Sequence, residues 1–316
     1  MDLRNSGFSL WCDFIERNFL NTEFKNLITS NIIYGATSNP SIFANAILKS
    51  DAYRADIEKL RDKKAKDIYE NLAFSDIKNA AHLLLPLWEK NKNDGFISIE
   101  IDPMLCDDAT KSIDEGKRIF KTIGFPNVMI KVPATNAGFE VMNELYKSSI
   151  NVNATLVFST KQTKLALESF GKTTSTNAPK AVISIFVSRF DRALEDINKT
   201  KDSTPKLGIY NAINCYNLIE SFANPNIRTL FASTGVKDSF IDSSYYINSL
   251  LFKNSINTAP LDTIKDFIKR DSKIIIPESN INDYLHNIDV DSMSKILLDD
   301  GLKSFIKSFE DMLGAI

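Results

Sequence analysis

The sequence predicts a closed barrel of eight parallel strands, each followed by a helix: a (β/α)8 or TIM barrel of the α/β class, with extra helices. Short apolar runs alternate with longer segments whose apolar residues repeat at helical spacing. The length of 316 residues is usual for such a barrel with additions. Polar residues also lie within or just after many of the runs, where barrel active sites are built. An open doubly wound sheet is the alternative, but no glycine-rich nucleotide motif follows a strand.

The expected elements follow one another along the whole chain. The strands are 8–14, 32–38, 95–102, 128–133, 150–159, 181–188, 228–234 and, more weakly, 255–260. Helical spacing is clearest in 66–90, 160–170 and 290–316. In the last of these, the apolar residues on roughly one face are Ile296, Leu298, Leu302, Phe305, Phe309, Met312 and Leu313. No linker or repeat divides the chain, so we expect a single barrel domain over 1–316 with a C-terminal helical segment at about 261–316.

Composition excludes several classes of function. The net charge of −2 gives no electrostatic reason to expect nucleic acid or an anionic membrane as a partner. No apolar run reaches the roughly 18 residues of a membrane span, and the N-terminus lacks the features of a signal peptide, so a cytoplasmic location is expected. The cysteines Cys12, Cys106 and Cys215 are interpreted as free thiols. With two histidines, they are too few for a metal cluster of the usual spacing, so no metal is expected.

Lys131 is the most unusual residue of the expected strands. It lies inside the apolar run Val128–Pro133, "VMIKVP". A buried ammonium is costly unless it is paired or loses its proton. A neutral amine attacks a ketone to form a Schiff base, and the protonated imine then accepts electrons from a neighbouring C–C bond. A lysine whose stem packs while its ammonium reaches a salt bridge is the structural alternative.

Other strand ends carry groups that suit this chemistry. Glu100 ends an apolar run and could pair with Lys131 or act as a general acid and base through a water. Asn153 and Thr155 are two apart on a strand and are therefore expected to face the same side. Asp13 could exchange the proton of a hydroxyl as the C–C bond breaks, although a helix N-cap is its structural alternative.

Six motifs in order resemble the transaldolase family. They are "GATSNPSIF" (35–43), "IEIDP" (99–103), "MIKVPATNAG" (129–138), "INVNATLVFS" (150–159), "ISIFVSRFD" (183–191) and "ASTGVKD" (232–238). The resemblance is to the longer-chain branch. It implies a barrel of the Schiff-base (class I) aldolase type, no cofactor and a place in the non-oxidative pentose phosphate pathway. The implied reaction moves a dihydroxyacetone unit from sedoheptulose 7-phosphate to glyceraldehyde 3-phosphate, giving erythrose 4-phosphate and fructose 6-phosphate.

The resemblance also implies a role for each matching residue. Lys131 corresponds to the Schiff-base lysine, Asp13 to the aspartate that handles the hydroxyl proton, and Glu100 and Thr155 to the residues that hold a catalytic water. The residues implied to bind substrate are Asn39, Asn153 and Ser184 for the dihydroxyacetone hydroxyls, Phe186 as an aromatic wall and Arg189 for the phosphate.

One departure concerns the phosphate. Shorter-chain relatives carry a second phosphate-binding arginine after strand seven, where this chain has Gly235. Lys237 lies just beyond, in a loop on the expected active-site face, and we predict that it replaces the arginine. Arg228 begins the same strand, so it is expected to lie at the opposite rim and to be structural.

Rival functions remain at this point. A fructose 6-phosphate aldolase shares the fold and the lysine, but that branch carries glutamine and tyrosine where this chain has Glu100 and Phe186. A catalytically silent sugar-phosphate-binding barrel is the alternative from a different class. Sugar phosphates are the expected partners in each case, and both a monomer and a homodimer are compatible with the sequence.

Overall fold

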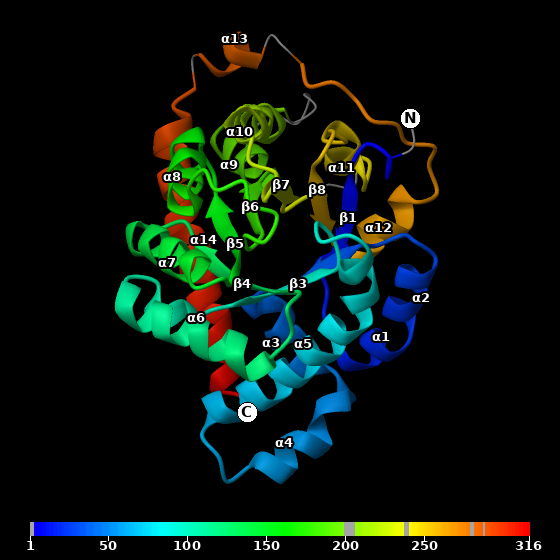
Figure 1. Cartoon of the computed structure of the whole chain (residues 1–316), viewed down its shortest axis with the longest axis vertical. Coiled ribbons are helices and arrows are strands. Elements are labelled where there is room, and N and C mark those ends of the chain that lie inside the picture. The colour runs from blue at the N-terminus through cyan, green and yellow to red at the C-terminus, as the bar shows by residue number, and fades with distance from the viewer. Residues whose placement is uncertain (1–2, 199–205, 237–239, 279–280, 287) are drawn as a thin grey trace.

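The strands close into a parallel barrel. The computed structural model describes residues 3–198, 206–236, 240–278, 281–286 and 288–316, and within these ranges eight strands pair in sequence order, with the last pairing the first (Figure 1). They are β1 (Ser9–Cys12), β2 (Gly35–Thr37), β3 (Phe96–Glu100), β4 (Val128–Pro133), β5 (Asn151–Val157), β6 (Ala181–Phe186), β7 (Ile227–Ala232) and β8 (Ile256–Ala259). The predicted fold class is confirmed, and each strand lies within, or within one residue of, its predicted segment.

Helices surround this barrel in Figure 1. The α-helices are α1 (Arg17–Asn21), α2 (Glu23–Thr29), α3 (Pro40–Lys49), α4 (Arg54–Leu60), α5 (Ala65–Lys90), α6 (Ala109–Ile123), α7 (Asn136–Lys147), α8 (Thr160–Phe170), α9 (Ser188–Asn198), α10 (Leu207–Phe222), α11 (Tyr245–Ser249), α12 (Leu261–Phe267), α13 (Ile281–Leu285) and α14 (Val290–Leu313). Two 3₁₀ turns, η1 (Asp51–Tyr53) and η2 (Pro103–Leu105), precede α4 and α6. The expected helices 66–90 and 160–170 correspond to α5 and α8.

Local sequence explains where several helices begin. The side chains of Asp108, Thr135 and Ser159 accept backbone N–H bonds at the starts of α6, α7 and α8. These side chains satisfy donors that the first helical turn leaves unpaired. Thr135 and Ser159 closely follow β4 and β5, so these two strands are joined to their helices by short loops at the same rim.

The barrel interior is filled by large side chains below the site. Trp11, Met129 and Leu230 belong to one cluster of buried residues. The ring of Trp11 lies so close to Gly35 that a Cβ there would be 2.5 Å from a ring carbon. Glycine at this position therefore lets the indole occupy the barrel, and the interior is a packed floor instead of a pore.

The C-terminal helix α14 packs across the rim where the strands end. It contacts α3, η2, α9 and β5, and Ser41 and Ser308 share a hydrogen bond of 2.8 Å. Its buried residues are Ser294, Leu297, Gly301, Phe305, Phe309 and Met312. The prediction that Ile296 belongs to the packed face is wrong, since Ile296 is 60% exposed and Leu297 is buried instead. The buried side chains from Leu297 to Phe309 recur every four residues, so the face is centred one position later than the predicted one.

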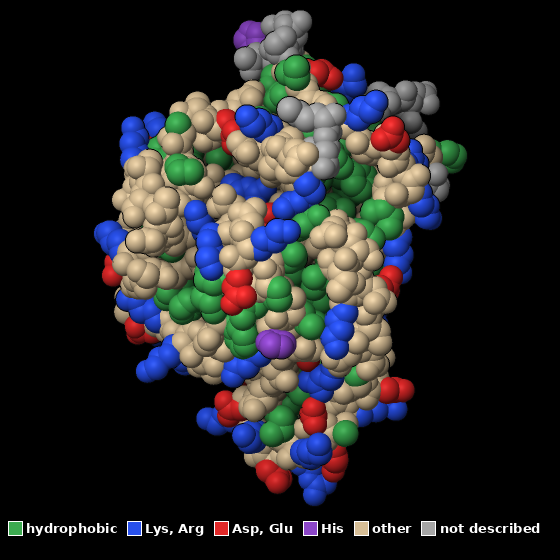
Figure 2. Space-filling view, turned by 45° about the vertical axis from the view of Figure 1, so that its right-hand side comes forward, with side chains coloured by type: hydrophobic (Ala, Val, Ile, Leu, Met, Phe, Trp, Pro, Cys, Tyr) green, Lys and Arg blue, Asp and Glu red, His purple; other side chains and the backbone are tan. Residues whose placement is uncertain are grey.

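The surface carries both signs of charge. On the face shown in Figure 2, basic and acidic side chains are interspersed with hydrophobic ones. This distribution agrees with the near-neutral net charge of the chain. Within the part of the chain that the structure describes, no helix is long and apolar enough to cross a membrane.

Candidate active site

Lys131 lies at the centre of the barrel rim with a paired ammonium. Strand β4 places it beside Glu100 of β3 and Asn153 of β5 in the register of the sheet. Its side chain is 7% exposed, its Nζ lies 2.9 Å from Glu100 Oε1, and it donates a hydrogen bond of 2.6 Å to the carbonyl oxygen of Ser38. The carboxylate and the carbonyl together offset the cost of burying the charge.

Ser38 contacts both members of this ion pair. Its carbonyl accepts from Lys131, and its Oγ lies 3.1 Å from Glu100 Oε2 and 2.9 Å from the carbonyl oxygen of Ser98. Burial raises the pKa of Glu100, and the neighbouring Lys131 and Ser38 oppose that rise. A carboxyl group with a raised pKa exchanges protons closer to neutral pH than an ordinary glutamate does.

Asp13 reaches the same rim from the end of β1. Thr37 Oγ1 lies 2.5 Å from Asp13 Oδ1, to which it donates, and 2.7 Å from Thr258 Oγ1. Burial raises the pKa of Asp13, and the charge of Lys131 opposes the rise. The N-cap of α1 is Glu16, whose side chain accepts from Phe19 N. The alternative interpretation of Asp13 as a helix cap is therefore wrong.

Asn153, Ser184 and Thr155 form a polar layer beside the lysine. Ser184 Oγ donates to Asn153 Oδ1 over 2.6 Å, and Asn153 Nδ2 donates to Ser98 Oγ over 2.9 Å. Thr155 Oγ1 is buried and has no hydrogen-bond partner among the described residues. A buried hydroxyl without a partner is a place where a water or a substrate hydroxyl can bind.

A cavity of about 510 Å³ opens onto these groups. Of the residues predicted from sequence, its lining includes Asp13, Asn39, Lys131, Ser184, Phe186 and Arg189. Asn39 caps α3 by accepting from Ile42 N over 3.0 Å. Glu100, Asn153 and Thr155 are buried around Lys131 without lining the cavity. The structure thus brings the predicted residues together around one opening, apart from Lys237, which lies outside the described residues.

The cavity also contains residues that the sequence analysis missed. They are Thr37, Ser41, Arg192, Ala232, Ser233, Thr258, Ser304 and Phe305. Arg192 follows Arg189 by three residues on α9, a spacing that places both on one face of a helix and could have been noticed. Ser304 and Phe305 come from α14, and nothing in their local pattern links them to a site whose lysine lies far earlier in the chain.

Arg189 and Phe186 form one wall of the cavity. The guanidinium carbon of Arg189 lies 5.2 Å from the centre of the Phe186 ring, and that ring lies 5.3 Å from the ring of Phe158. A cation over an aromatic face is held by the negative charge of the ring face. This contact orients the guanidinium without using its hydrogen-bond donors.

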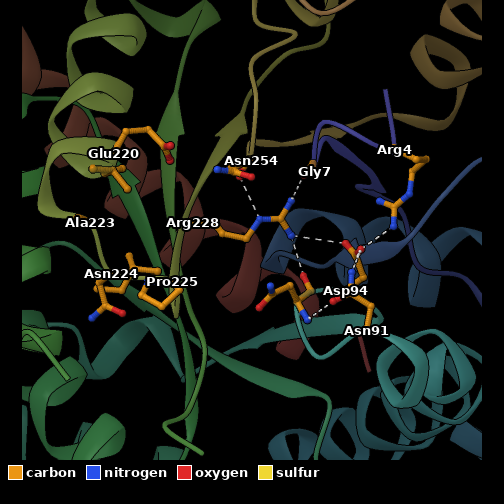
Figure 3. A pocket seen from close by; sticks show the side chains of 13 residues that line it. Arg4, Gly7, Asn91, Asp94, Glu220, Ala223, Asn224, Pro225, Arg228 and Asn254 are labelled. Atoms are coloured by element: carbon orange, nitrogen blue, oxygen red, sulfur yellow. Dashed lines mark hydrogen bonds and ion pairs between the residues drawn. The ribbon is translucent and has the colours of Figure 1, made fainter. Parts of the chain in front are cut away.

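Arg228 lies at the opposite rim, as predicted (Figure 3). Its guanidinium donates to the carbonyls of Gly7 (2.6 Å), Asn93 (2.7 Å) and Asn254 (3.0 Å). It also lies 3.5 Å from Asp94, which in turn pairs with Arg4 at 2.8 Å. A second cavity, of about 360 Å³, adjoins these residues, and in it Asp94 forms ion pairs with both Arg4 and Arg228. The arrangement is that of a structural clamp.

The two rims therefore differ in chemistry. One holds a buried amine beside a carboxylate at the floor of a cavity, with a second carboxyl, several hydroxyls and two guanidinium groups around it. Such a set can form and hydrolyse a Schiff base and bind an anion at a distance from it. Within the described ranges, no three or more His, Cys, Asp or Glu side chains are placed to hold a metal ion.

Comparison with known proteins identifies relatives along nearly the whole chain. A family model described as Transaldolase/Fructose-6-phosphate aldolase matches residues 10–316. A transaldolase of Helicobacter pylori (strain P12) is 50% identical over 314 residues, covering 97% of this chain and 98% of the relative. A transaldolase of Campylobacter jejuni subsp. doylei is 51% identical over 328 aligned positions, covering 98% of this chain and 99% of the relative.

Proposed function

The chain belongs to the transaldolase/fructose-6-phosphate aldolase family and acts as a transaldolase, and we propose that Lys131 forms the Schiff base of its reaction. The reaction transfers a dihydroxyacetone unit from sedoheptulose 7-phosphate to glyceraldehyde 3-phosphate, giving erythrose 4-phosphate and fructose 6-phosphate. The observation that carries the proposal is the ion pair of Lys131 and Glu100 at the floor of the cavity.

The first half of the reaction needs a neutral amine and a proton shuttle. Lys131 gives a proton to Glu100, 2.9 Å away, and its nitrogen adds to the substrate ketone. The resulting carbinolamine loses its hydroxyl as water, for which Glu100 supplies the proton. Thr155, whose hydroxyl lacks a described partner, would hold the water that links Glu100 to the reacting carbon. The product is a positively charged imine beside an ionised carboxylate.

Asp13 completes the cleavage step. It takes the proton from the hydroxyl on the carbon that becomes the aldehyde, the electron pair of the breaking C–C bond moves to the imine, and the aldehyde leaves. A three-carbon enamine stays on Lys131. The acceptor aldehyde then adds by the reverse path, with Asp13 returning the proton. The raised pKa of Asp13 supports this role, because a base that must also return its proton works best with a pKa near the working pH.

The hydroxyls of the three-carbon unit meet the polar layer. Ser184 and Asn153 are already joined by a 2.6 Å hydrogen bond, so their positions are set before substrate binds. Asn39 uses its Oδ1 as a helix cap, which leaves its Nδ2 to donate to the substrate. We assign these three residues to the dihydroxyacetone hydroxyls, Phe186 to the cavity wall and Arg189 to the phosphate.

Transfer and simple aldol cleavage differ in the fate of the enamine. A transferase holds it until an aldehyde arrives, whereas an aldolase protonates it and releases dihydroxyacetone. Phe186 lines the cavity and has no proton to offer, whereas a tyrosine hydroxyl there could assist protonation. This difference favours transfer over release in the present chain.

A coupled assay tests the proposed function. With fructose 6-phosphate and erythrose 4-phosphate, we expect continuous formation of glyceraldehyde 3-phosphate and sedoheptulose 7-phosphate. Without the acceptor, release of dihydroxyacetone should be slow, and Phe186→Tyr should raise it. Release without acceptor that is as fast as transfer in the unmutated protein would place the chain with the aldolases.

A single functional domain over 1–316, a cytoplasmic location and a monomeric or homodimeric state stay predictions from sequence.

A further inference from the structure

Two arginines of helix α9 face the same cavity. Arg189 and Arg192 lie in the first two turns of α9, three residues apart, and both line the opening above Lys131. Side chains at this spacing lie on one face of a helix. Between them, Asp191 is buried, and its carboxylate accepts from Gly208 N (3.1 Å) and Tyr246 Oη (3.0 Å). These bonds fix α9 against α10 and α11, and thereby fix the direction in which the two arginines extend.

Neither guanidinium is neutralised by a described carboxylate. No ion pair or hydrogen bond to the side chain of Arg189 or Arg192 occurs within the described part of the chain. Burial lowers the pKa of Arg189, the charge of Arg192 lowers it further, and Asp300 of α14 opposes this from longer range. Two like charges held close together beside a cavity are unfavourable unless an anion joins them.

We propose that Arg192 is the second cation that binds the phosphate group of the substrates, together with Arg189. This inference rests on the proposed function, which supplies the phosphorylated sugars. A phosphate carries a charge of about −1.5 to −2 and several acceptor oxygens, which two guanidinium forks match in both charge and geometry. Ser233, just after β7, also lines this cavity, and its hydroxyl carries no charge. Arg192 therefore takes the part that the sequence analysis assigned to Lys237.

The location of Arg192 has a consequence for both substrates. In donor and acceptor alike, the phosphate is at the end of the sugar farthest from the reacting carbon. The two arginines extend from α9 while Lys131 lies on β4, so the same pair of cations serves both molecules. The three-carbon unit itself carries no phosphate, and Arg192 contributes nothing to its binding.

The test removes the charge of Arg192 and measures substrates with and without phosphate. For Arg192→Ala and Arg192→Gln, we expect KM for fructose 6-phosphate and for erythrose 4-phosphate to rise about 10- to 100-fold, the size of one lost charge-assisted contact. Unphosphorylated dihydroxyacetone should be fixed onto Lys131 by borohydride as efficiently as in the unmutated protein. Arg61→Ala is the matched control, because Arg61 caps the C-terminal end of α4, its side chain is 70% exposed, and it pairs with Glu58 far from the cavity. Lys237→Ala tests the earlier assignment.

The outcomes separate the inference from the proposed function. Unchanged KM values for both Arg192 variants, with a raised KM for Lys237→Ala, would overturn the inference and restore Lys237. If a folded Arg192→Gln protein loses dihydroxyacetone fixation by the same factor as it loses affinity for the sugar phosphates, the role of Arg192 is structural. That result would overturn the inference as well. If the unmutated protein transfers nothing between the two sugar phosphates, the proposed function fails and the inference fails with it.

Discussion

At the scale of single residues, the backbone carbonyl and the side-chain hydroxyl of Ser38 contact different members of the ion pair in the site. Its carbonyl binds the ammonium of Lys131, and its hydroxyl lies within reach of the carboxylate of Glu100. The two charged groups are thus held 2.9 Å apart in a buried place where either would be costly alone. In the proposed reaction the imine keeps a positive charge near Glu100, so the ion pair is retained.

Removing the hydroxyl of Ser38 should shift the pH dependence of the reaction. The hydroxyl donates to ionised Glu100 and so lowers its pKa, against the rise that burial causes. In Ser38→Ala the ionised form loses a donor, so the pKa of Glu100 rises further. We expect the acid limb of the kcat/KM profile to move to higher pH by about one unit, since a hydrogen bond to a charged group contributes about 1.5–3 kcal/mol and one pKa unit is 1.36 kcal/mol.

The matched control for this change is Ser41→Ala. Ser41 lines the same cavity but bonds to Ser308 instead of a catalytic carboxyl, so its removal should leave the limb in place. If the acid limb of the kcat/KM profile does not move in Ser38→Ala, the hydroxyl of Ser38 donates to the carbonyl of Ser98 and not to Glu100.

At the scale of elements, strands and helices supply different parts of the active-site cavity. Strand ends supply Lys131, Glu100 and Asp13, whose spacing is set by the register of the barrel. Helices α9 and α14 supply the outer part of the cavity. A Cβ at Gly301 of α14 would lie 2.8 Å from Leu156 and 3.0 Å from Arg189, so this glycine allows α14 to approach the arginine closely.

The opposite rim depends on one arginine that joins several elements. Arg228 at the start of β7 connects the segment before β1, the loop before β3 and the loop before β8 through its bonds to Gly7, Asn93 and Asn254. In Arg228→Ala these carbonyls and Asp94 lose a buried donor. We expect the free energy of unfolding, measured in urea, to fall by about 3 kcal/mol while KM stays unchanged.

A comparison of two arginines makes this prediction specific. Arg61→Ala, an exposed change, should alter the unfolding free energy by less than about 0.5 kcal/mol. If KM for phosphorylated substrates rises about tenfold in a stable Arg228→Ala protein, the phosphate binds at the rim of Arg228. Our assignment of the phosphate to the rim of Lys131 would then be wrong.

At the scale of the whole molecule, the barrel could be predicted because its strands are nearly continuous apolar runs. Even the weak segment 255–260 forms β8, since closure requires a partner for both β1 and β7. The strand-borne site residues were predicted for the same reason: a charged or amide side chain in a buried strand is conspicuous. Residues on amphipathic helices are not, because a lysine or arginine there is ordinarily solvated. Arg189 was predicted because it closely follows β6 and matches a family motif, whereas Arg192, three residues farther along α9, was missed. The position of Ser304 and Phe305 depends on tertiary packing of α14.

The central claim is that Lys131 carries the substrate covalently. The most direct measurement is treatment with fructose 6-phosphate and borohydride, followed by peptide mass analysis. We predict a reduced three-carbon adduct on the peptide that contains Lys131, and neither adduct nor turnover in Lys131→Met. An adduct on a different lysine, or normal turnover by a folded Lys131→Met protein, would contradict the account.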